Sequence, residues 1–317
     1  MSNLVMRQRA LGLRALRQGV AWQKSVRPKK VRWNLMRRSV IGGVLCLLAG
    51  CYAMLADAGA SPEASSDTQV LTLSAADQRV GRALYVAPLH PRGVIVMLPG
   101  GAGDIGLTPS GKITHGHNMV VRTRALWNAK GYAVLIVDTV AHANLRGLRS
   151  APAYAKYIAQ WVAEAHRLQK GPVFLMGTSQ GSIAAVNGAA HAPEGSVAGV
   201  VLTESVSVLG HSGETVFSAQ PERIKIPVLI VANQQDRCFV APPQMAERIA
   251  AAMVASPDVR VATVSGGTSS AASANACGSL TPHGYYGIEQ QVVDIISPWL
   301  DAHAGRSPSP RAPFPNN

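Results

Sequence analysis

Acidic residues are missing from the first 40 positions of this 317-residue chain, which carry 11 of its 30 lysines and arginines. The other 19 basic residues lie beyond Cys51 together with all 17 acids, so the net charge of +13 arises almost entirely in the N-terminal segment. A domain that binds nucleic acid carries clustered basic residues on its folded surface. The nearly neutral remainder of this chain therefore argues against a nucleic-acid partner, and the charge indicates a targeting segment.

Cysteine is also scarce, and two of the four cysteines, Cys46 and Cys51, fall in the apolar stretch that follows Arg37-Arg38. Positive charge followed by a short apolar run is typical of a secretory signal. The stretch ends Leu48-Ala49-Gly50-Cys51, which resembles a bacterial lipobox. The resemblance implies that Cys51 is lipidated. Because Tyr52 and not an aspartate follows the cysteine, the resemblance to sorted lipoproteins implies an outer-membrane lipoprotein facing the periplasm.

Two alternatives to lipidation stay open for this segment. Apolar character persists to about Ala56, close to the lower limit for a membrane span, which allows an uncleaved signal anchor. Ordinary cleavage after the signal is the other alternative. All three place the domain outside the cytoplasm, and a start at Met36 instead of Met1 would give a signal of compact length.

Composition divides the chain into four parts. Residues 1–50 form the basic extension and signal, and residues 51–68, rich in Ala, Ser, Pro and acids, read as a flexible tether. Residues 305–317 form a disordered Pro-rich tail. With 47% hydrophobic residues in the chain, residues 69–304 are long enough for one α/β domain with a sizeable core.

A strand, a sharp turn and a helix are predicted in sequence around Ser179. Val173 to Met176 is a short apolar run, and an Ala-rich stretch follows from Ser182 to Ala190. Between them, Gly177-Thr178-Ser179-Gln180-Gly181 matches G-x-S-x-G, in which a strained turn exposes the serine hydroxyl. Ser179 is the candidate nucleophile.

With Asp and His residues following in that order, the chain resembles the α/β-hydrolase superfamily over about residues 69–303. The resemblance implies a doubly wound, mainly parallel sheet flanked by helices. It also implies that Asp236, after the predicted strand over 228–232, is the triad acid, and that His283, in the loop before the last helix, is the general base. Asp138, at the end of the strand over 133–137, stays open as an alternative acid.

The glycine-rich loop Pro99 to Gly103 follows the first central strand. By the resemblance, this loop donates one backbone N–H to an oxyanion hole and the residue after the nucleophile donates the other, which implies Gly101 and Gln180. The usual His-Gly pair reads Pro99-Gly100 here, which leaves the choice between Gly101 and Ala102 open. A phosphate-binding loop is disfavoured because no Lys-Ser/Thr follows at the required spacing.

The two remaining cysteines lie close in sequence to the candidate acid and base. Cys238 comes two residues after Asp236, and Cys277 comes six residues before His283. If Asp236 contacts His283, the two cysteines approach each other, and an exported domain would oxidise them to a disulfide. Two buried free thiols are the alternative.

Insertions and metal-binding patterns are sparse. Only about 24 residues separate the predicted strands over 197–203 and 228–232, too few for the large helical cap of many relatives, so an open site is expected. His115 and His117 have a spacing that could hold a metal, but no third ligand follows in register. The sequence therefore predicts no metal and no cofactor.

These residues predict a serine hydrolase, with a carboxylesterase acting on small acyl esters as the default. A thioesterase or amidase of the same fold stays open, as does a non-catalytic surface lipoprotein that uses the scaffold for binding. The residues around Asp236, Cys277 and His283 resemble exported bacterial hydrolases, a resemblance that carries no particular substrate.

Overall fold

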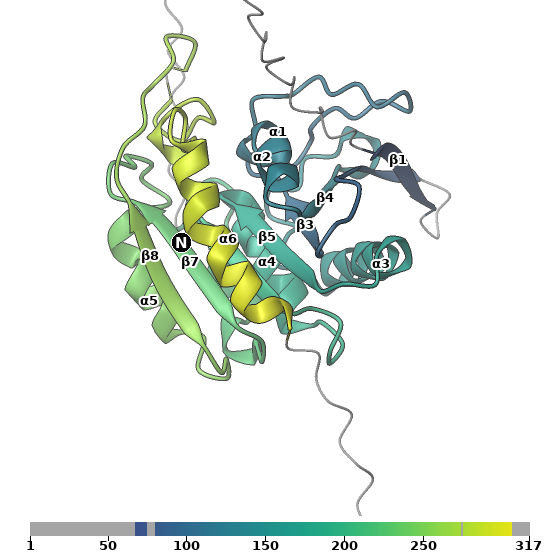
Figure 1. The fold of residues 1–317 in the computed structure, drawn as a ribbon. Coiled ribbons are helices and arrows are strands. Elements are labelled where there is room, and N and C mark those ends of the chain that lie inside the picture. Colours follow the sequence, from purple (N-terminus) through teal and green to yellow (C-terminus); the bar gives the residue numbers. More distant parts are fainter. Residues whose placement is uncertain (1–66, 75–79, 274, 306–317) are drawn as a thin grey trace, which may run out of the picture. The chain divides into compact units, whose positions relative to one another are not determined.

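The computed structural model describes residues 67–74, 80–273 and 275–305 (Figure 1). The predicted signal, the lipidation site at Cys51, nearly all of the tether and the tail beyond Gly305 lie outside these residues. Among the helices of the described residues, none combines the length and the apolar character needed to cross a membrane.

A single eight-stranded sheet organises the domain, in the order β1-β2-β4-β3-β5-β6-β7-β8. The β1–β2 and β2–β4 pairs are antiparallel and the other five pairs are parallel, which confirms the predicted mainly parallel, doubly wound sheet. The strands are β1 (Asp67–Ser74), β2 (Val80–Ala87), β3 (Val94–Leu98), β4 (Ala133–Val137), β5 (Val173–Thr178), β6 (Gly199–Thr203), β7 (Val228–Asn233) and β8 (Val259–Val264).

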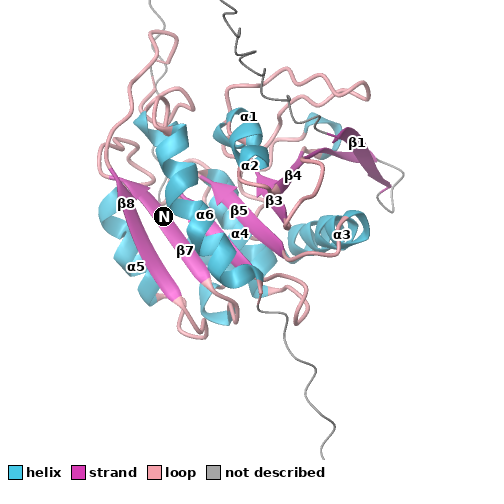
Figure 2. Ribbon diagram, in the orientation of Figure 1, coloured by secondary structure: helices cyan, strands magenta, loops and turns pink. Residues whose placement is uncertain are grey.

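Helices cover both faces of the sheet (Figures 1 and 2). One face packs against α3 (Pro152–Leu168), α4 (Gln180–Ala190) and α5 (Ala246–Ala251). The other packs against α1 (Met119–Arg122), α2 (Arg124–Ala129) and α6 (Glu289–Ala304). Because successive side chains of a strand point to opposite faces, β3 sends Val94, Val96 and Leu98 to the first core and Ile95 and Met97 to the second.

The parallel strands bring the candidate site residues to one edge of the sheet. Parallel strands share the edge at which their carboxyl ends lie, and ligand sites of open α/β sheets form there. Loops that leave β3, β5, β7 and β8 at this edge carry Gly101, Ser179, Asp236 and His283 respectively. Residues 204–227, between β6 and β7, form only two short 3₁₀ turns, so no large domain inserted there covers this edge.

Candidate active site

Ser179 occupies a turn that only the observed glycines allow. Its backbone has φ +52°, a left-handed conformation that is costly for a residue with a side chain. A Cβ on Gly177 would lie 2.2 Å from the carbonyl oxygen of Gly181, and a Cβ on Gly181 would lie 2.0 Å from that of Leu98. The close approach of α4 to β3 and β5 therefore explains both glycines of G-x-S-x-G.

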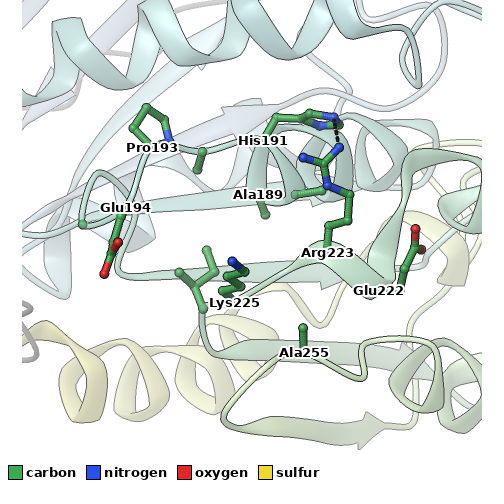
Figure 3. Close-up of a pocket in the computed structure, with 12 residues that line it drawn as sticks. Ala189, His191, Pro193, Glu194, Glu222, Arg223, Lys225 and Ala255 are labelled. Carbon is green, nitrogen blue, oxygen red and sulfur yellow. Dashed lines mark hydrogen bonds between the residues drawn. The ribbon is translucent and has the colours of Figure 1, made fainter.

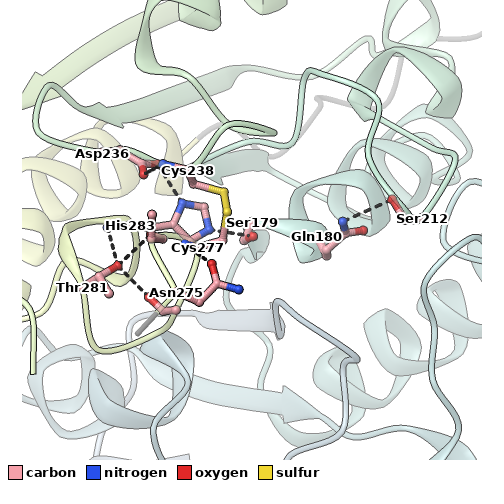
Figure 4. The surroundings of a disulfide bond; sticks show 11 residues. Ser179, Gln180, Ser212, Asp236, Cys238, Asn275, Cys277, Thr281 and His283 are labelled. Carbon is pink, nitrogen blue, oxygen red and sulfur yellow. Dashed lines mark hydrogen bonds and ion pairs between the residues drawn. A yellow bond between two sulfur atoms is a disulfide. The ribbon is translucent and has the colours of Figure 1, made fainter. Parts of the chain in front are cut away.

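The structure brings Ser179, His283 and Asp236 together in a line (Figure 4). His283 Nε2 lies 2.8 Å from Ser179 Oγ, and His283 Nδ1 lies 2.7 Å from Asp236 Oδ2. The histidine and the aspartate are 3% and 4% exposed, whereas Ser179 stays partly exposed. The hydroxyl is thus the member of the line that a solute can reach.

Backbone contacts fix the Asp236 carboxylate in place. Oδ1 accepts the N–H of Cys238 at 2.7 Å, which leaves Oδ2 for the histidine. Asn233, the last residue of β7, donates from Nδ2 to the carbonyls of Gly266 and Pro282 at 2.9 Å each. These bonds join the loop of the aspartate to the loop of the histidine.

Asp138, the alternative acid, is engaged elsewhere. Its carboxylate accepts the backbone N–H groups of Ile105, Leu107 and Thr139 at 2.7–2.8 Å. Burial raises the pKa of Asp138, and the three N–H donors oppose that shift. The contacts of Asp138 hold the segment after the glycine-rich loop in place. The carboxylate that contacts His283 is that of Asp236.

Two backbone N–H groups beside Ser179 lack acceptors within the described part of the chain, those of Gly101 and Gln180. Gly101 has φ +60°, and both residues line a cavity together with Ser179. Ala102, the other residue that the sequence left open, does not line this cavity. Free N–H groups next to a nucleophile are what a developing oxyanion requires.

Arg149 donates hydrogen bonds to the glycine-rich loop. The sequence did not predict this role. The side chain is buried, and Nη2 donates to the carbonyls of Pro99 and Gly101 at 3.3 and 3.0 Å. Burial lowers the pKa of Arg149. No local pattern distinguishes Arg149 from a surface arginine, because its partners lie about fifty residues away in the chain.

A disulfide joins Cys238 to Cys277, as the sequence predicted for these residues (Figure 4). It connects the loop of Asp236 to the loop that leads to His283, across a sequence separation of 39. Closing a loop of this size contributes about 3 to 4 kcal/mol to stability on the loop-entropy scale. The bridge also limits how far the histidine loop can move from the aspartate.

Two cavities flank Ser179. One, of about 60 Å³, is lined by Asn118, Met119 and Ser279 among others. The other, of about 180 Å³, is lined by Arg146, Phe239 and further residues, none of them a carboxylate. A carbonyl carbon placed at Ser179 would thus have a small compartment on one side and a larger, more open one on the other.

A larger cavity, of about 670 Å³, lies at the opposite edge of the sheet (Figure 3). It is bordered by the end of α4 and by the segments that precede β6 and β7, where His191 and Arg223 are 3.2 Å apart. Its walls contain no serine or cysteine, and its charged side chains are exposed. It therefore offers no serine or cysteine nucleophile, and the candidate site is the cavity pair at Ser179.

Glu204, Asp236 and His283 are the one metal-like cluster among the described residues, with possible ligand atoms within 4.8 Å of one another. Both ring nitrogens of His283 are already engaged, by Asp236 and by Ser179. Two carboxylates would remain, fewer than the three or four protein ligands of a zinc site. The donor set therefore does not fit a metal centre.

No protein-family model matches the sequence, and no curated protein is significantly similar to it. Solved structures do match. A dienelactone hydrolase from Anabaena variabilis ATCC 29413 is 17% identical, with a TM-score of 0.55 over 75% of this chain and 99% of that one. Est1E from Butyrivibrio proteoclasticus is 16% identical, with a TM-score of 0.52 over 74% and 98%.

The esterase Pf2001 of Pyrococcus furiosus is 12% identical, with a TM-score of 0.55 over 76% of this chain and 92% of that one. At these identities the likeness concerns the fold, and with the strand order it shows that this chain has the α/β-hydrolase fold. The chemistry must be argued from the site itself.

Proposed function

We propose that the protein is a serine hydrolase that cleaves small acyl esters, with Ser179 as nucleophile, His283 as general base and Asp236 as the orienting acid. The observation that carries the proposal is the line of contacts, 2.8 Å from Ser179 Oγ to His283 Nε2 and 2.7 Å from His283 Nδ1 to Asp236 Oδ2. The position of the serine on a strained turn beside two free N–H groups supports it.

The reaction would run as two acyl transfers. His283 takes the Ser179 proton while Oγ attacks the acyl carbonyl carbon, and the N–H groups of Gly101 and Gln180 stabilise the oxyanion. His283 then returns the proton to the departing alcohol oxygen, which leaves Ser179 acylated. In the second step His283 takes a proton from water as the water attacks the acyl carbonyl carbon, and returns it to Ser179 Oγ as the acyl–oxygen bond breaks, so that the acid product leaves and the serine is restored.

The smaller of the two cavities at Ser179 favours esters with a short acyl chain. The small compartment, of about 60 Å³, has about a third of the volume of the larger one, of about 180 Å³, so the group confined there is small. The neighbours include a dienelactone hydrolase and esterases, and Est1E has been solved with ferulic acid bound, which supports ester substrates without fixing one. Thioester and amide hydrolysis are the alternatives that use the same site.

A panel of p-nitrophenyl esters tests the proposal. We expect kcat/KM to be highest for acetyl to butyryl esters and to fall by about tenfold or more at octanoyl, because longer chains exceed the small compartment. Met119→Val should shift the preference toward longer chains, since Met119 lines that compartment. Lys225→Ala, at the remote cavity, is the matched control and should leave the profile unchanged.

Two results of the panel would count against the proposal. Absence of turnover on all esters, with turnover of a thioester or an anilide of the same acyl group, would replace the esterase by one of the alternatives. A maximum at dodecanoyl would show that the small compartment does not limit the substrate.

We also propose that the protein is exported and anchored by a lipid on Cys51. The disulfide supports export, because such bonds persist in oxidising compartments. Expressed in a bacterium, the wild type should incorporate labelled fatty acid and fractionate with membranes, whereas Cys51→Ser should do neither. Cys46→Ser is the matched control and should keep the label. Membrane-bound, unlabelled Cys51→Ser that retains residues 1–50 would favour a signal anchor.

A further inference from the structure

Glu204 is a buried carboxyl that has no role in the acyl-transfer mechanism proposed above. It follows β6 directly, is 1% exposed and has a left-handed backbone with φ +44°. Oε1 accepts the N–H of Asn233 at 2.9 Å. Oε2 is buried and has no hydrogen-bond partner among the described residues. A strained backbone that buries such a group persists only where the surroundings fix it.

The carboxyl of Glu204 faces the candidate acid. Ligand atoms of Glu204, Asp236 and His283 lie within 4.8 Å of one another, and all three residues are buried. Tyr285, the other titratable side chain beside Glu204, donates its hydroxyl proton to the carbonyl of Val231 at 2.9 Å. Among the described residues, the groups that shift the pKa of Glu204 include no lysine or arginine that could offset a second negative charge there.

Two other buried carboxyl groups of this protein accept more hydrogen bonds than Glu204 does. Glu214 accepts four hydrogen bonds, three of them from the backbone N–H groups of residues 147, 149 and 150. Asp138 accepts three. Glu204 accepts one and faces another carboxylate. Burial first, and next the nearby Asp236, raise the pKa of Glu204 well above its usual range, and the contacts with the Tyr285 side chain and the N–H of Asn233 oppose that shift only in part.

We propose that Glu204 is a positioning residue that stays neutral and shares its proton with the Asp236 carboxylate, so holding that carboxylate on His283. The proposal rests on the proposed function only for its consequence in catalysis. A neutral Glu204 adds a donor behind Asp236 without adding charge. Asp236 then remains the single anion beside the histidine.

Turnover tests the positioning role. Glu204→Gln keeps a neutral donor, so we expect kcat within about threefold of wild type and the acidic limb of kcat/KM against pH unmoved. Glu204→Ala removes the donor, so kcat should fall by about tenfold to a hundredfold with KM within about twofold. Glu222→Gln is the matched control at an exposed glutamate and should change neither quantity.

Thermal stability tests the neutral state without any activity. A carboxyl whose pKa rises on folding is ionised in the unfolded chain and protonated in the folded one, so stability falls as pH rises above about 4.3 toward the folded-state pKa. Glutamine cannot ionise in either state. The melting temperature of Glu204→Gln minus that of wild type should therefore increase from about pH 5 to about pH 8, whereas Glu222→Gln should show a constant difference.

Turnover and thermal stability can each contradict a different part of the proposal. A flat stability difference for Glu204→Gln, or a shift of the acidic limb by about one pH unit or more, would show that Glu204 is ionised and would overturn the proposal. Unchanged kcat in Glu204→Ala would remove the positioning role. If Glu204→Ala does not fold, Glu204→Met, which lacks a donor but keeps most of the side-chain volume, replaces it in the kcat measurement with the same expected loss. Absence of any hydrolysis by the wild type would reject the proposed function and leave the stability test standing.

Discussion

Replacement of Ser179 by alanine is expected to lower kcat by about four to six orders of magnitude while the protein stays folded. The variant removes the one hydroxyl that meets His283 Nε2, at 2.8 Å. It leaves the backbone unchanged, since alanine carries the same cost as serine at φ +52°. The measurements are kcat on p-nitrophenyl acetate, the melting temperature, and labelling by a fluorophosphonate.

Labelling separates a catalytic serine from a structural one. The wild type should take up one fluorophosphonate per chain and Ser179→Ala none, because only a serine activated by a base attacks the reagent at an appreciable rate. Ser110→Ala is the matched control on an exposed serine and should label like the wild type. Activity above a tenth of wild type in Ser179→Ala would reject Ser179 as the nucleophile. A wild type that binds ligands but takes up no label would favour the non-catalytic scaffold.

The turn at Ser179 could be predicted because G-x-S-x-G is a local pattern between a predicted strand and a predicted helix. The contact that requires Gly177 is local, with the carbonyl oxygen of Gly181, whereas the contact that requires Gly181 is with the carbonyl oxygen of Leu98 on β3, which is remote in sequence. The sequence also placed Asp236 and His283 in loops that follow β7 and β8, which the strand order brings to the same edge as Ser179. The cysteine pairing followed from that meeting.

Arg149 and Glu204 could not be predicted, because their partners are remote in sequence. Arg149 contacts carbonyls of a loop about fifty residues earlier. Glu204 meets Asn233 and Asp236 only when the carboxyl ends of β6 and β7 lie side by side. In the sequence neither residue belongs to a recognisable motif. The sizes of the two cavities were equally hidden, because their walls come from four or more separate loops.

Asp236→Asn is expected to lower kcat by about four orders of magnitude. Asp236 Oδ1 accepts the Cys238 N–H at 2.7 Å, so the asparagine carbonyl oxygen would keep that contact and its NH₂ group would face His283 Nδ1. Nδ1 must then act as an acceptor, which puts the ring proton on Nε2, the nitrogen that has to receive the Ser179 proton. The imidazole would be held in the wrong tautomer.

Asp138→Asn is the matched control for this prediction. It should lower the melting temperature, because an amide replaces a carboxylate that accepts three backbone N–H groups, and should leave kcat of the folded protein within about threefold of wild type. Both variants need kcat and fluorophosphonate labelling rates over a range of pH, with folding checked by circular dichroism. A large loss of kcat in Asp138→Asn and little loss in Asp236→Asn would show that the assignment of the triad acid is wrong. It would mean that the aspartate after β4, and not the one after β7, supports His283 during turnover.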